Sequence, residues 1–338
     1  MLAACATTPP APSDDPLIIA HRGASSERPE HTLEAYARAI EQGADYIEPD
    51  LVMTRDGVFV ARHENEISGT TDIADHPEFA DRRTTRTIDG SEVTGWFTED
   101  FTLAELKTLR ARERLPQLRP GNAEYDRQFE VPSLAEILDL VQSAGRPVGL
   151  APEIKHPGYF RSIGLPMEEA LAGQLAAAGY ETASDPVIIQ SFEIAPLVRL
   201  DQLTDLRLLQ LIGNEGGPAD APGMRYPHML TPEGLRAIGR YADAIGPDKA
   251  YLIRWTPEGE LGDPTGLVAA AHETGLAVIP YTFRPENYFL PQSMRSGADP
   301  RARGDSPAEI ARYLTLGIDG LFTDHVPAAL EARSAFAR

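Results

Sequence analysis

Short apolar runs alternate with amphipathic segments along most of the chain. Eight runs have the length and aliphatic composition of buried strands: 17–20, 46–52, 148–154, 187–190, 206–212, 244–246, 277–281 and 320–323. Other segments have apolar residues at helical spacing: 32–42, 134–144, 166–178, 193–203, 232–241, 265–274 and 307–316. Thr32 and Gly43 are the residue types expected at the start and end of the first helix. Strands that alternate with helices in this way indicate βαβ units and a parallel sheet.

The number of these units favours one fold within the α/β class. Eight short strand–helix units predict a TIM-type (β/α)8 barrel over residues 17–338. The sequence has no G-x-G-x-x-G motif after the first strand and no Walker loop, which disfavours a doubly wound nucleotide-binding fold. In such barrels the chemistry lies at the carboxyl ends of the strands, so the residues at strand ends are the candidates for a site.

Residues 64–131 interrupt the alternation. This region is polar, and its clearest helical pattern is FTLAELKTLR at 101–110. We expect it to be an insertion after the hairpin of the second strand, forming a lid over the mouth of the barrel. Its aromatic residues could shape a pocket or, as we favour, could pack a small core of the insertion itself: Phe79, Trp96, Phe97 and Tyr125.

The charge of the chain limits its partners. The 338 residues have a formal net charge of −20 and a pI of about 4.8. Such a surface repels nucleic acids and anionic lipids, so neither is an expected partner. No run approaches the ~20 apolar residues of a membrane-spanning helix. An anionic substrate would need local positive charge, and a bound metal ion is a common source of it.

Residues 1–16 differ in composition from the rest of the chain. Leu2-Ala3-Ala4-Cys5 resembles the lipidation motif of bacterial lipoproteins, and a segment rich in Pro, Ala, Thr and Ser follows it. Cys5 is the only cysteine, so an internal disulfide is impossible. We expect an extended tether with a lipid anchor at Cys5, which would place the protein in the periplasm or cell envelope. The alternative is a disordered tail with an inert thiol.

Acidic residues gather at the predicted strand ends. Glu48 and Asp50 are two residues apart in a strand, so their side chains point to the same face. Glu153, near the end of the next barrel strand, could add a third carboxylate. Three carboxylates without sulfur are the ligand set of a hard cation, Ca²⁺ or Mg²⁺. The alternative is two ordinary ion pairs, with Glu153 partly occupied by Lys155, but the three carboxylates together favour the metal.

The segment LVMTRDGVFVARHE adds a histidine at the same end of the barrel. Its Asp56-Gly57 pair predicts a two-residue hairpin turn with positive φ at both residues. Residues 55 and 58 then pair, and Asp50 lies opposite His63 on one face of the hairpin. A slip of one residue would turn His63 to the other face.

These residues together predict a chemistry. His21, at the end of the first strand, and His63 lie near the expected cation and could form an acid/base pair. Arg22 and Lys155 add fixed positive charge suited to phosphate oxygens. The combination predicts a site that cleaves phosphodiesters. A sugar isomerase or a carboxylic-ester hydrolase would not need so much positive charge.

At these residues the chain resembles the glycerophosphodiester phosphodiesterase family, and more narrowly its secreted or periplasmic branch. The resemblance rests on motifs that occur in order: IIAHRGAS, PEHTLEAYARAIEQGADYIEPDLVMTRDGVFVARHE, PEIKHP, QSFE, YTFR and GLFTDH. It implies a TIM-type barrel with an insertion after the hairpin. It also implies hydrolysis of glycerophosphodiesters, such as glycerophosphocholine and glycerophosphoethanolamine, to an alcohol and sn-glycerol 3-phosphate.

The resemblance implies a role for each candidate residue. The acid/base pair would be His21 and His63, and the ligands of one divalent cation, usually Ca²⁺ in this branch, would be Glu48, Asp50 and Glu153. The phosphate would contact Arg22 and Lys155, and the rest of the substrate would lie in a pocket lined by Phe192, Tyr281 and Phe283. We expect His31, at the start of the first helix, to fix the loop after the first strand rather than to act in catalysis.

Two other functions stay open. A phospholipase C or D that acts on intact lipids would need an apolar mouth facing a membrane, whereas the insertion here is acidic and polar. A surface lipoprotein that binds glycerophosphodiesters without cleaving them would be expected to lack one of the histidines or metal ligands. All of these residues are present.

Overall fold

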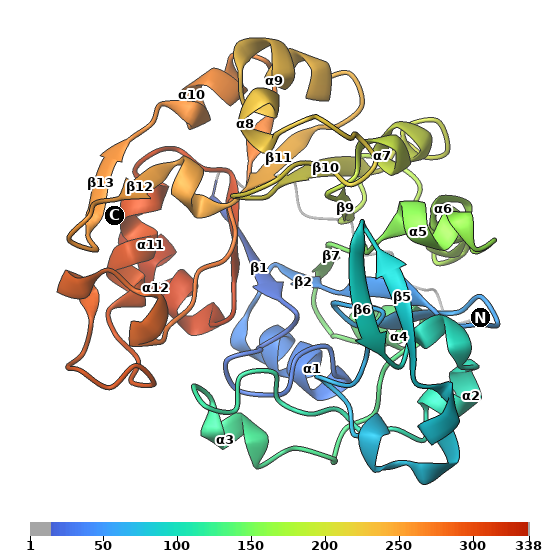
Figure 1. The fold of residues 1–338 in the computed structure, drawn as a ribbon. Coiled ribbons are helices and arrows are strands. Elements are labelled where there is room, and N and C mark those ends of the chain that lie inside the picture. The colour runs from blue at the N-terminus through green and yellow to red at the C-terminus, as the bar shows by residue number, and fades with distance from the viewer. Residues whose placement is uncertain (1–14, 337–338) are drawn as a thin grey trace, which may run out of the picture.

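The structure, a computed structural model, describes residues 15–336. Its parallel strands form a ring that is surrounded by helices (Figure 1). The ring consists of β1 (Leu17–His21), β2 (Tyr46–Glu48), β3 (Asp50–Met53), β7 (Gly149–Leu150), β8 (Glu153–Ile154), β9 (Ile188–Ser191), β10 (Arg207–Ile212), β11 (Ala244–Pro247), β14 (Ala277–Val278) and β15 (Gly320–Thr323). The predicted barrel is therefore present, and each predicted strand has a counterpart in it.

The ring is made of two hydrogen-bonded sheets. Their strand orders are β15-β1-β2-β7 and β14-β11-β10-β9-β8-β3, with β4 (Phe59–Ala61) as the last strand of the second sheet. The bridge Leu150↔Val187 joins them on one side, and the bridge Phe283↔Thr323 closes the ring on the other.

Prolines mark the points where two predicted strands divide. Pro49 separates β2 from β3, and Pro152 lies between β7 and β8, so each predicted strand belongs to both sheets. Proline has no N–H and cannot continue a ladder of donors. Both carbonyl groups still accept bonds, Pro49 from the N–H of Glu153 and Pro152 from that of Gln190. The carboxylates Glu48, Asp50 and Glu153 therefore lie beside these breaks.

The predicted helices are all present on the outside of the ring. They are α1 (Leu33–Gln42), α4 (Leu134–Gln142), α6 (Met167–Ala177), α7 (Ile194–Leu200), α9 (Pro232–Ile238), α10 (Leu267–His272) and α11 (Ser306–Leu314). The predicted ends of α1 are confirmed, since the Thr32 hydroxyl accepts from the N–H of Ala35 and Gly43 has a φ of 97°. The pattern did not predict α5 (Pro157–Ser162), α8 (Tyr226–Met229) or the C-terminal α12 (Val326–Phe336).

The predicted register of the β3–β4 hairpin is wrong by one residue. Leu51 pairs with Ala61, which places Arg62 opposite Asp50. The loop has three residues, and only Gly57 has a positive φ, of 76°. Thr54 explains the difference, because its hydroxyl accepts from the N–H of Val58 and donates to the Asp56 carboxylate at 2.6 Å, which favours the longer loop.

The insertion, residues 64–131, lies between β4 and α4. It contains the hairpin of β5 (Thr84–Ile88) and β6 (Ser91–Gly95) and short helices: η1 (Ile73–Asp75), η2 (Pro77–Arg82), η3 (Thr98–Asp100), α2 (Leu103–Leu106) and α3 (Pro120–Ala123). The helix expected at 101–110 is thus a single turn. Phe79 packs edge-on against Phe101, and the Trp96 indole donates to the Phe79 carbonyl, so aromatic residues do pack a core within the insertion. Its role as a lid stays a prediction.

Later loops add small elements at the rim of the barrel. They are η4 (Lys249–Tyr251), the hairpin of β12 (Ile253–Trp255) and β13 (Leu261–Pro264), η5 (Asn287–Phe289) and η6 (Gln292–Met294). Nine buried apolar residues form a separate core cluster with members on the barrel strands, including Ile19, Leu209 and Phe322. Among the described residues, no helix is both long and apolar enough to cross a membrane. Cys5 and most of the expected tether lie outside the described residues.

Candidate active site

A cavity of about 250 Å³ opens at the carboxyl ends of the barrel strands. Residues that lie in or directly after β1, β2, β8, β9, β11 and β15 meet there, as expected for a barrel of this type. Its lining includes His21, Arg22, Glu48, His63, Glu153, Gln190, Phe192, Asp248, Tyr281 and Arg284. Most of the residues predicted from sequence to form the site thus line one cavity.

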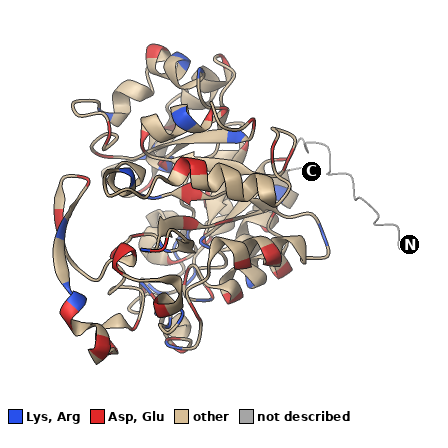
Figure 2. Cartoon of the chain, turned by 90° about the vertical axis from the view of Figure 1, so that its right-hand side faces the viewer, with Lys and Arg blue, Asp and Glu red and all other residues tan. Residues whose placement is uncertain are grey.

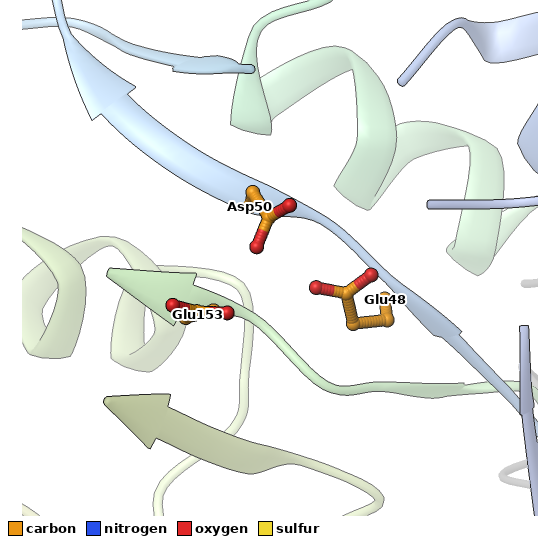
Figure 3. A group of neighbouring side chains, drawn as sticks. All are labelled: Glu48, Asp50 and Glu153. Carbon is orange, nitrogen blue, oxygen red and sulfur yellow. The ribbon is translucent and has the colours of Figure 1, made fainter. Parts of the chain in front are cut away.

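The three predicted metal ligands converge at one side of this cavity. One carboxylate oxygen from each of Glu48, Asp50 and Glu153 lies within 4.8 Å of the others, and all three residues are buried. Figure 3 shows the two carboxylates of the β2–β3 strand directed toward Glu153 on the neighbouring β8. Lys155 also contacts Glu153, with its Nζ 2.8 Å from Oε1, so the ion pair of the alternative interpretation is present within the same group.

The charges of this cluster conflict unless a cation is present. Burial and the neighbouring Asp50 raise the pKa of Glu48 well above its usual value, and burial raises the pKa of Glu153 to about 8. Burial opposes ionisation of Asp50 too, but Lys155 and Arg22 hold its pKa well below the usual value. Buried carboxylates that repel one another and offer only oxygen ligands fit a hard divalent cation.

His31 holds one of these carboxylates in place. Its Nε2 lies 2.8 Å from Oδ2 of Asp50, and its Nδ1 lies 2.7 Å from the Tyr36 hydroxyl on α1. The ring is fully buried and is not part of the cavity lining. The expected role of His31 is to fix the loop after β1, and its backbone N–H does donate to the carbonyl of Arg22 there, whereas its ring contacts Asp50 and Tyr36.

The two candidate acid/base residues lie on the cavity wall. His21 ends β1, and its Nδ1 lies 2.7 Å from Oδ1 of Asp324. His63 follows β4, and its Nδ1 contacts Oε1 of Glu64. His63 faces the cavity despite the one-residue slip in the hairpin, because β4 ends at Ala61 and strand alternation no longer fixes its direction.

Both imidazoles are neutral at pH 7 in the free site. Burial lowers the pKa of His21 to about 4, and Arg22 adds to the effect. Burial, Arg22 and Lys155 lower the pKa of His63 to about 3. A bound phosphate anion would offset the charge of Arg22 and Lys155 and so favour protonation of one ring.

Comparison with known proteins identifies the family of this chain. Residues 21–328 match the model of the Glycerophosphoryl diester phosphodiesterase family. The chain belongs to this family.

Relatives in this phosphodiesterase family come from distant organisms. A glycerophosphodiester phosphodiesterase of Arabidopsis thaliana is 37% identical over 332 residues, which cover 94% of this chain and 86% of the relative. One of Haemophilus influenzae is 31% identical over 301 residues, which cover 80% of each chain.

Solved structures share the fold. A phosphodiesterase of Oleispira antarctica in complex with sn-glycerol-3-phosphate superposes with a TM-score of 0.61 at 18% identity, and covers 95% of this chain and 97% of its own. A glycerophosphodiester phosphodiesterase of Agrobacterium tumefaciens gives a TM-score of 0.59 at 19% identity, with 93% and 98% covered.

The aromatic residues of the pocket are partly those predicted for this phosphodiesterase. Phe192 and Tyr281 line the cavity and meet edge-on, with ring centroids 6.0 Å apart. The expectation for Phe283 is wrong, because its ring is fully buried and packs against Tyr313 with centroids 4.9 Å apart. Parallel pairing beside β11 continues to the bridge Asp248↔Tyr281, but Phe283 pairs with Thr323 of β15 instead, so the alternation that would set Phe283 on the face of Tyr281 does not extend to it.

Three charged residues of the phosphodiesterase site received no role from sequence. Asp324 contacts His21, and Asp248 and Arg284 line the cavity. All three follow a barrel strand directly or within a few residues: Asp248 follows β11, and Asp324 follows β15. The rule that strand ends carry the chemistry could have selected them, but nothing in the sequence gave their partners.

Proposed function

We propose that the chain hydrolyses glycerophosphodiesters, such as glycerophosphocholine and glycerophosphoethanolamine, to an alcohol and sn-glycerol 3-phosphate. The observation that carries this proposal is the cluster of Glu48, Asp50 and Glu153, two of which, Glu48 and Glu153, line one cavity with His21 and His63. Membership of the phosphodiesterase family supports it. The product bound to the related Oleispira antarctica enzyme supports the assignment of sn-glycerol 3-phosphate.

A divalent cation held by Glu48, Asp50 and Glu153 would complete the site, and we propose Ca²⁺, with Mg²⁺ as the alternative. When bound, such an ion withdraws negative charge from phosphate oxygens. The three residues supply only carboxylate oxygens, which suit either ion. Arg22 and Lys155 flank the cluster, and they would bind the remaining phosphate oxygens and orient the phosphodiester for attack.

The two histidines would move the protons. One imidazole accepts the proton of the nucleophile, which is water or the neighbouring glycerol hydroxyl. The other ring, protonated once the phosphate anion is bound, donates a proton to the oxygen of the leaving alcohol as its bond to phosphorus breaks. Phe192 and Tyr281 would contact the rest of the substrate.

Incubation with glycerophosphocholine tests the proposal. We expect choline and sn-glycerol 3-phosphate in equal amounts with Ca²⁺, and none after a chelator has removed divalent ions. Phosphatidylcholine and sphingomyelin vesicles should not be cleaved. Cleavage of the vesicles alone would indicate a phospholipase, and calorimetric binding of glycerophosphocholine without products would indicate a binding protein.

Substitution of either active-site histidine should remove turnover. We expect His21→Ala and His63→Ala to lower kcat by about 10²–10⁴-fold, because each removes one proton transfer. His272→Ala is the matched control, since His272 pairs with Asp319 on the surface and is 41% exposed. The measurement is initial rate with Ca²⁺ present, after circular dichroism has shown that each variant is folded. Near-native rates in either of the first two variants would contradict the assignment.

We also propose that the protein is a lipoprotein of the bacterial cell envelope, anchored through Cys5. The support is the Leu2–Cys5 motif and the Pro-rich segment behind it. Mass spectrometry of the N-terminal peptide from the native host tests this: a diacylglyceryl thioether at Cys5 is the expected result, and an unmodified thiol contradicts it.

A further inference from the structure

Each active-site histidine has a carboxylate at its Nδ1. Oδ1 of Asp324 lies 2.7 Å from Nδ1 of His21, and Oε1 of Glu64 contacts Nδ1 of His63. An ionised carboxylate accepts hydrogen bonds and donates none, so it selects the neutral tautomer that has hydrogen on Nδ1. The lone pair then lies on Nε2 in both rings.

Both carboxylates are held by arginines of the insertion, residues 64–131. Arg119 donates from Nη2 to Oδ2 of Asp324 at 2.5 Å. Arg114 donates to both oxygens of Glu64, at 3.0 and 2.7 Å. Arg284 is the other cation at Asp324, with its Nε at 3.2 Å from Oδ2. Each histidine is therefore the end of a chain that runs from arginine to carboxylate to imidazole.

The arginines are themselves fixed to the barrel. Arg119 donates to both oxygens of Glu286, at 2.7 and 3.3 Å, and to the carbonyl of Ser25 at 2.9 Å. Arg114 donates twice to Glu30, which also accepts from Arg22 at 3.1 Å.

The burial of Arg119 argues for a role beyond stability. Arg119 and Asp324 are 7% and 2% exposed. Removing both ions of such a pair from water is costly, so a buried pair is poor evidence for stability. It does define orientation, because a guanidinium binds a carboxylate in a fixed plane.

We propose that the insertion is a positioning part of the catalytic site, in which Arg119 and Arg114 hold the carboxylates Asp324 and Glu64 that orient His21 and His63. This inference rests on the proposed catalytic roles of the two histidines. It deepens them, because it assigns the tautomer of each ring and makes the insertion part of the machinery rather than a cover alone. Replacing a residue that orients a metal-binding histidine typically lowers activity by about 10–100-fold, and we expect a similar loss here.

Arg119 is the place to test the proposal. We expect Arg119→Gln to lower kcat about 10–100-fold with little change in KM, since the substrate contacts remain. Arg119→Lys keeps the charge and should recover part of the loss. Arg127→Gln is the matched control, because Arg127 belongs to the same insertion but pairs with Asp75 on the surface and is 56% exposed. Calorimetry should show unchanged Ca²⁺ binding in all three variants.

The tautomer gives a readout that does not depend on turnover. In ¹⁵N spectra of the histidine-labelled protein at pH 7.5, the His21 signals are those absent from His21→Gln, and they should show hydrogen on Nδ1. Asp324→Asn places an amide donor at this nitrogen, so the hydrogen should move to Nε2, and kcat should fall about 10²–10⁴-fold. If Arg119→Gln does not fold, Arg119→Lys and Asp324→Asn decide the question.

Two results would overturn the inference. They are a kcat in folded Arg119→Gln equal to that of Arg127→Gln, and hydrogen on Nε2 of His21 in the unsubstituted protein. Failure of the proposed function looks different: the unsubstituted protein would not cleave glycerophosphocholine, while the spectra would still report which nitrogen carries hydrogen.

Discussion

A single buried ring connects the carboxylate cluster to the helical layer. His31 bonds to Asp50 at one ring nitrogen and to the Tyr36 hydroxyl at the other. The side chains of His31 and Tyr36 are fully buried. The residue has a φ of 54°, a backbone conformation that is uncommon outside glycine. Its position thus depends on the loop and on α1 together, and Asp50 depends on it.

The Tyr36 hydroxyl offers a direct measure of this connection. We expect Tyr36→Phe to lower the free energy of unfolding by about 1–3 kcal/mol, because Nδ1 of His31 loses its partner in a dry environment. Tyr313→Phe is the matched control: among the described residues, the buried Tyr313 hydroxyl has no hydrogen-bond partner. That substitution should be neutral or stabilising. Urea unfolding monitored by circular dichroism distinguishes the two, and equal losses would contradict the proposed bond.

At the scale of elements, the sequence was most informative where one local rule decides the outcome. Hydrophobic spacing located every predicted helix, and the cap residues Thr32 and Gly43 set the ends of α1. It was least informative where a side-chain hydrogen bond or a change of strand partner competes with such a rule. The Thr54 side chain lengthened the hairpin loop and shifted the register, and the change of strand partner after Tyr281 accompanies the burial of Phe283 in the core.

In the candidate site, too, local patterns predicted some residues, and contacts between distant parts of the chain could not be predicted. Glu48 and Asp50 could be predicted because a strand alternates, and Glu153 because neighbouring strands end at one rim. The partnership of Asp324 with His21 spans 303 residues, and that of Asp324 with Arg119 spans 205. No local pattern reports such a pairing, which requires the closed ring and the path of the insertion around it.

Two glycines allow the packed β1–α1 loop, which contains Gly23, to be compared with the open β3–β4 loop, which contains Gly57. Gly23 has a φ of 84°, and a Cβ there would lie 2.7–2.9 Å from atoms of Ala35 on α1. Gly57 has a φ of 76° with no atom within 4 Å of such a Cβ. Gly57→Ala should therefore cost about 1–2 kcal/mol of backbone strain and leave activity intact.

Gly23→Ala should cost more than Gly57→Ala and should also reduce turnover, because the displaced loop contains His21 and Arg22. The backbone N–H of Arg22 also donates to Glu48 at 2.7 Å. Urea unfolding and initial rates with glycerophosphocholine, measured on both variants, test this. Equal effects of the two substitutions would show that α1 moves aside without cost.

At the scale of the whole molecule, negative charge is spread rather than concentrated. Figure 2 shows Asp and Glu on many helices and loops, with Lys and Arg between them. The formal charge of −20 therefore repels anions generally, and the local cations Arg22 and Lys155 act against that background. Acidic residues inside the fold respond to pH differently from those on this surface.

Glu193 gives a pH dependence whose sign can be worked out. Burial raises its pKa from 4.5 to about 7, so the folded protein binds this proton more tightly than the unfolded chain does. The resulting stabilisation is complete below pH 4.5 and is lost as the pH rises through 7. It amounts to up to about 3 kcal/mol.

Glu193→Gln keeps this side chain neutral and still able to accept from the N–H of Gly158. Relative to the unsubstituted protein, its free energy of unfolding should increase between pH 5 and pH 8, as measured by urea unfolding with Ca²⁺ present. Glu233→Gln, which removes a carboxylate that is 80% exposed, controls for the change in net charge. A difference that stays constant with pH would contradict the assignment.

The direction in which the chain enters the barrel bears on how the enzyme would meet its substrate. β1 begins at Leu17 on the rim opposite the cavity, where Arg333 of α12 donates to the carbonyl of Pro16. A lipid at Cys5, as proposed, would pull on that far rim. The catalytic mouth lies at the other rim, so the attachment point would not cover it, and it would stay open to diesters that diffuse through the aqueous compartment.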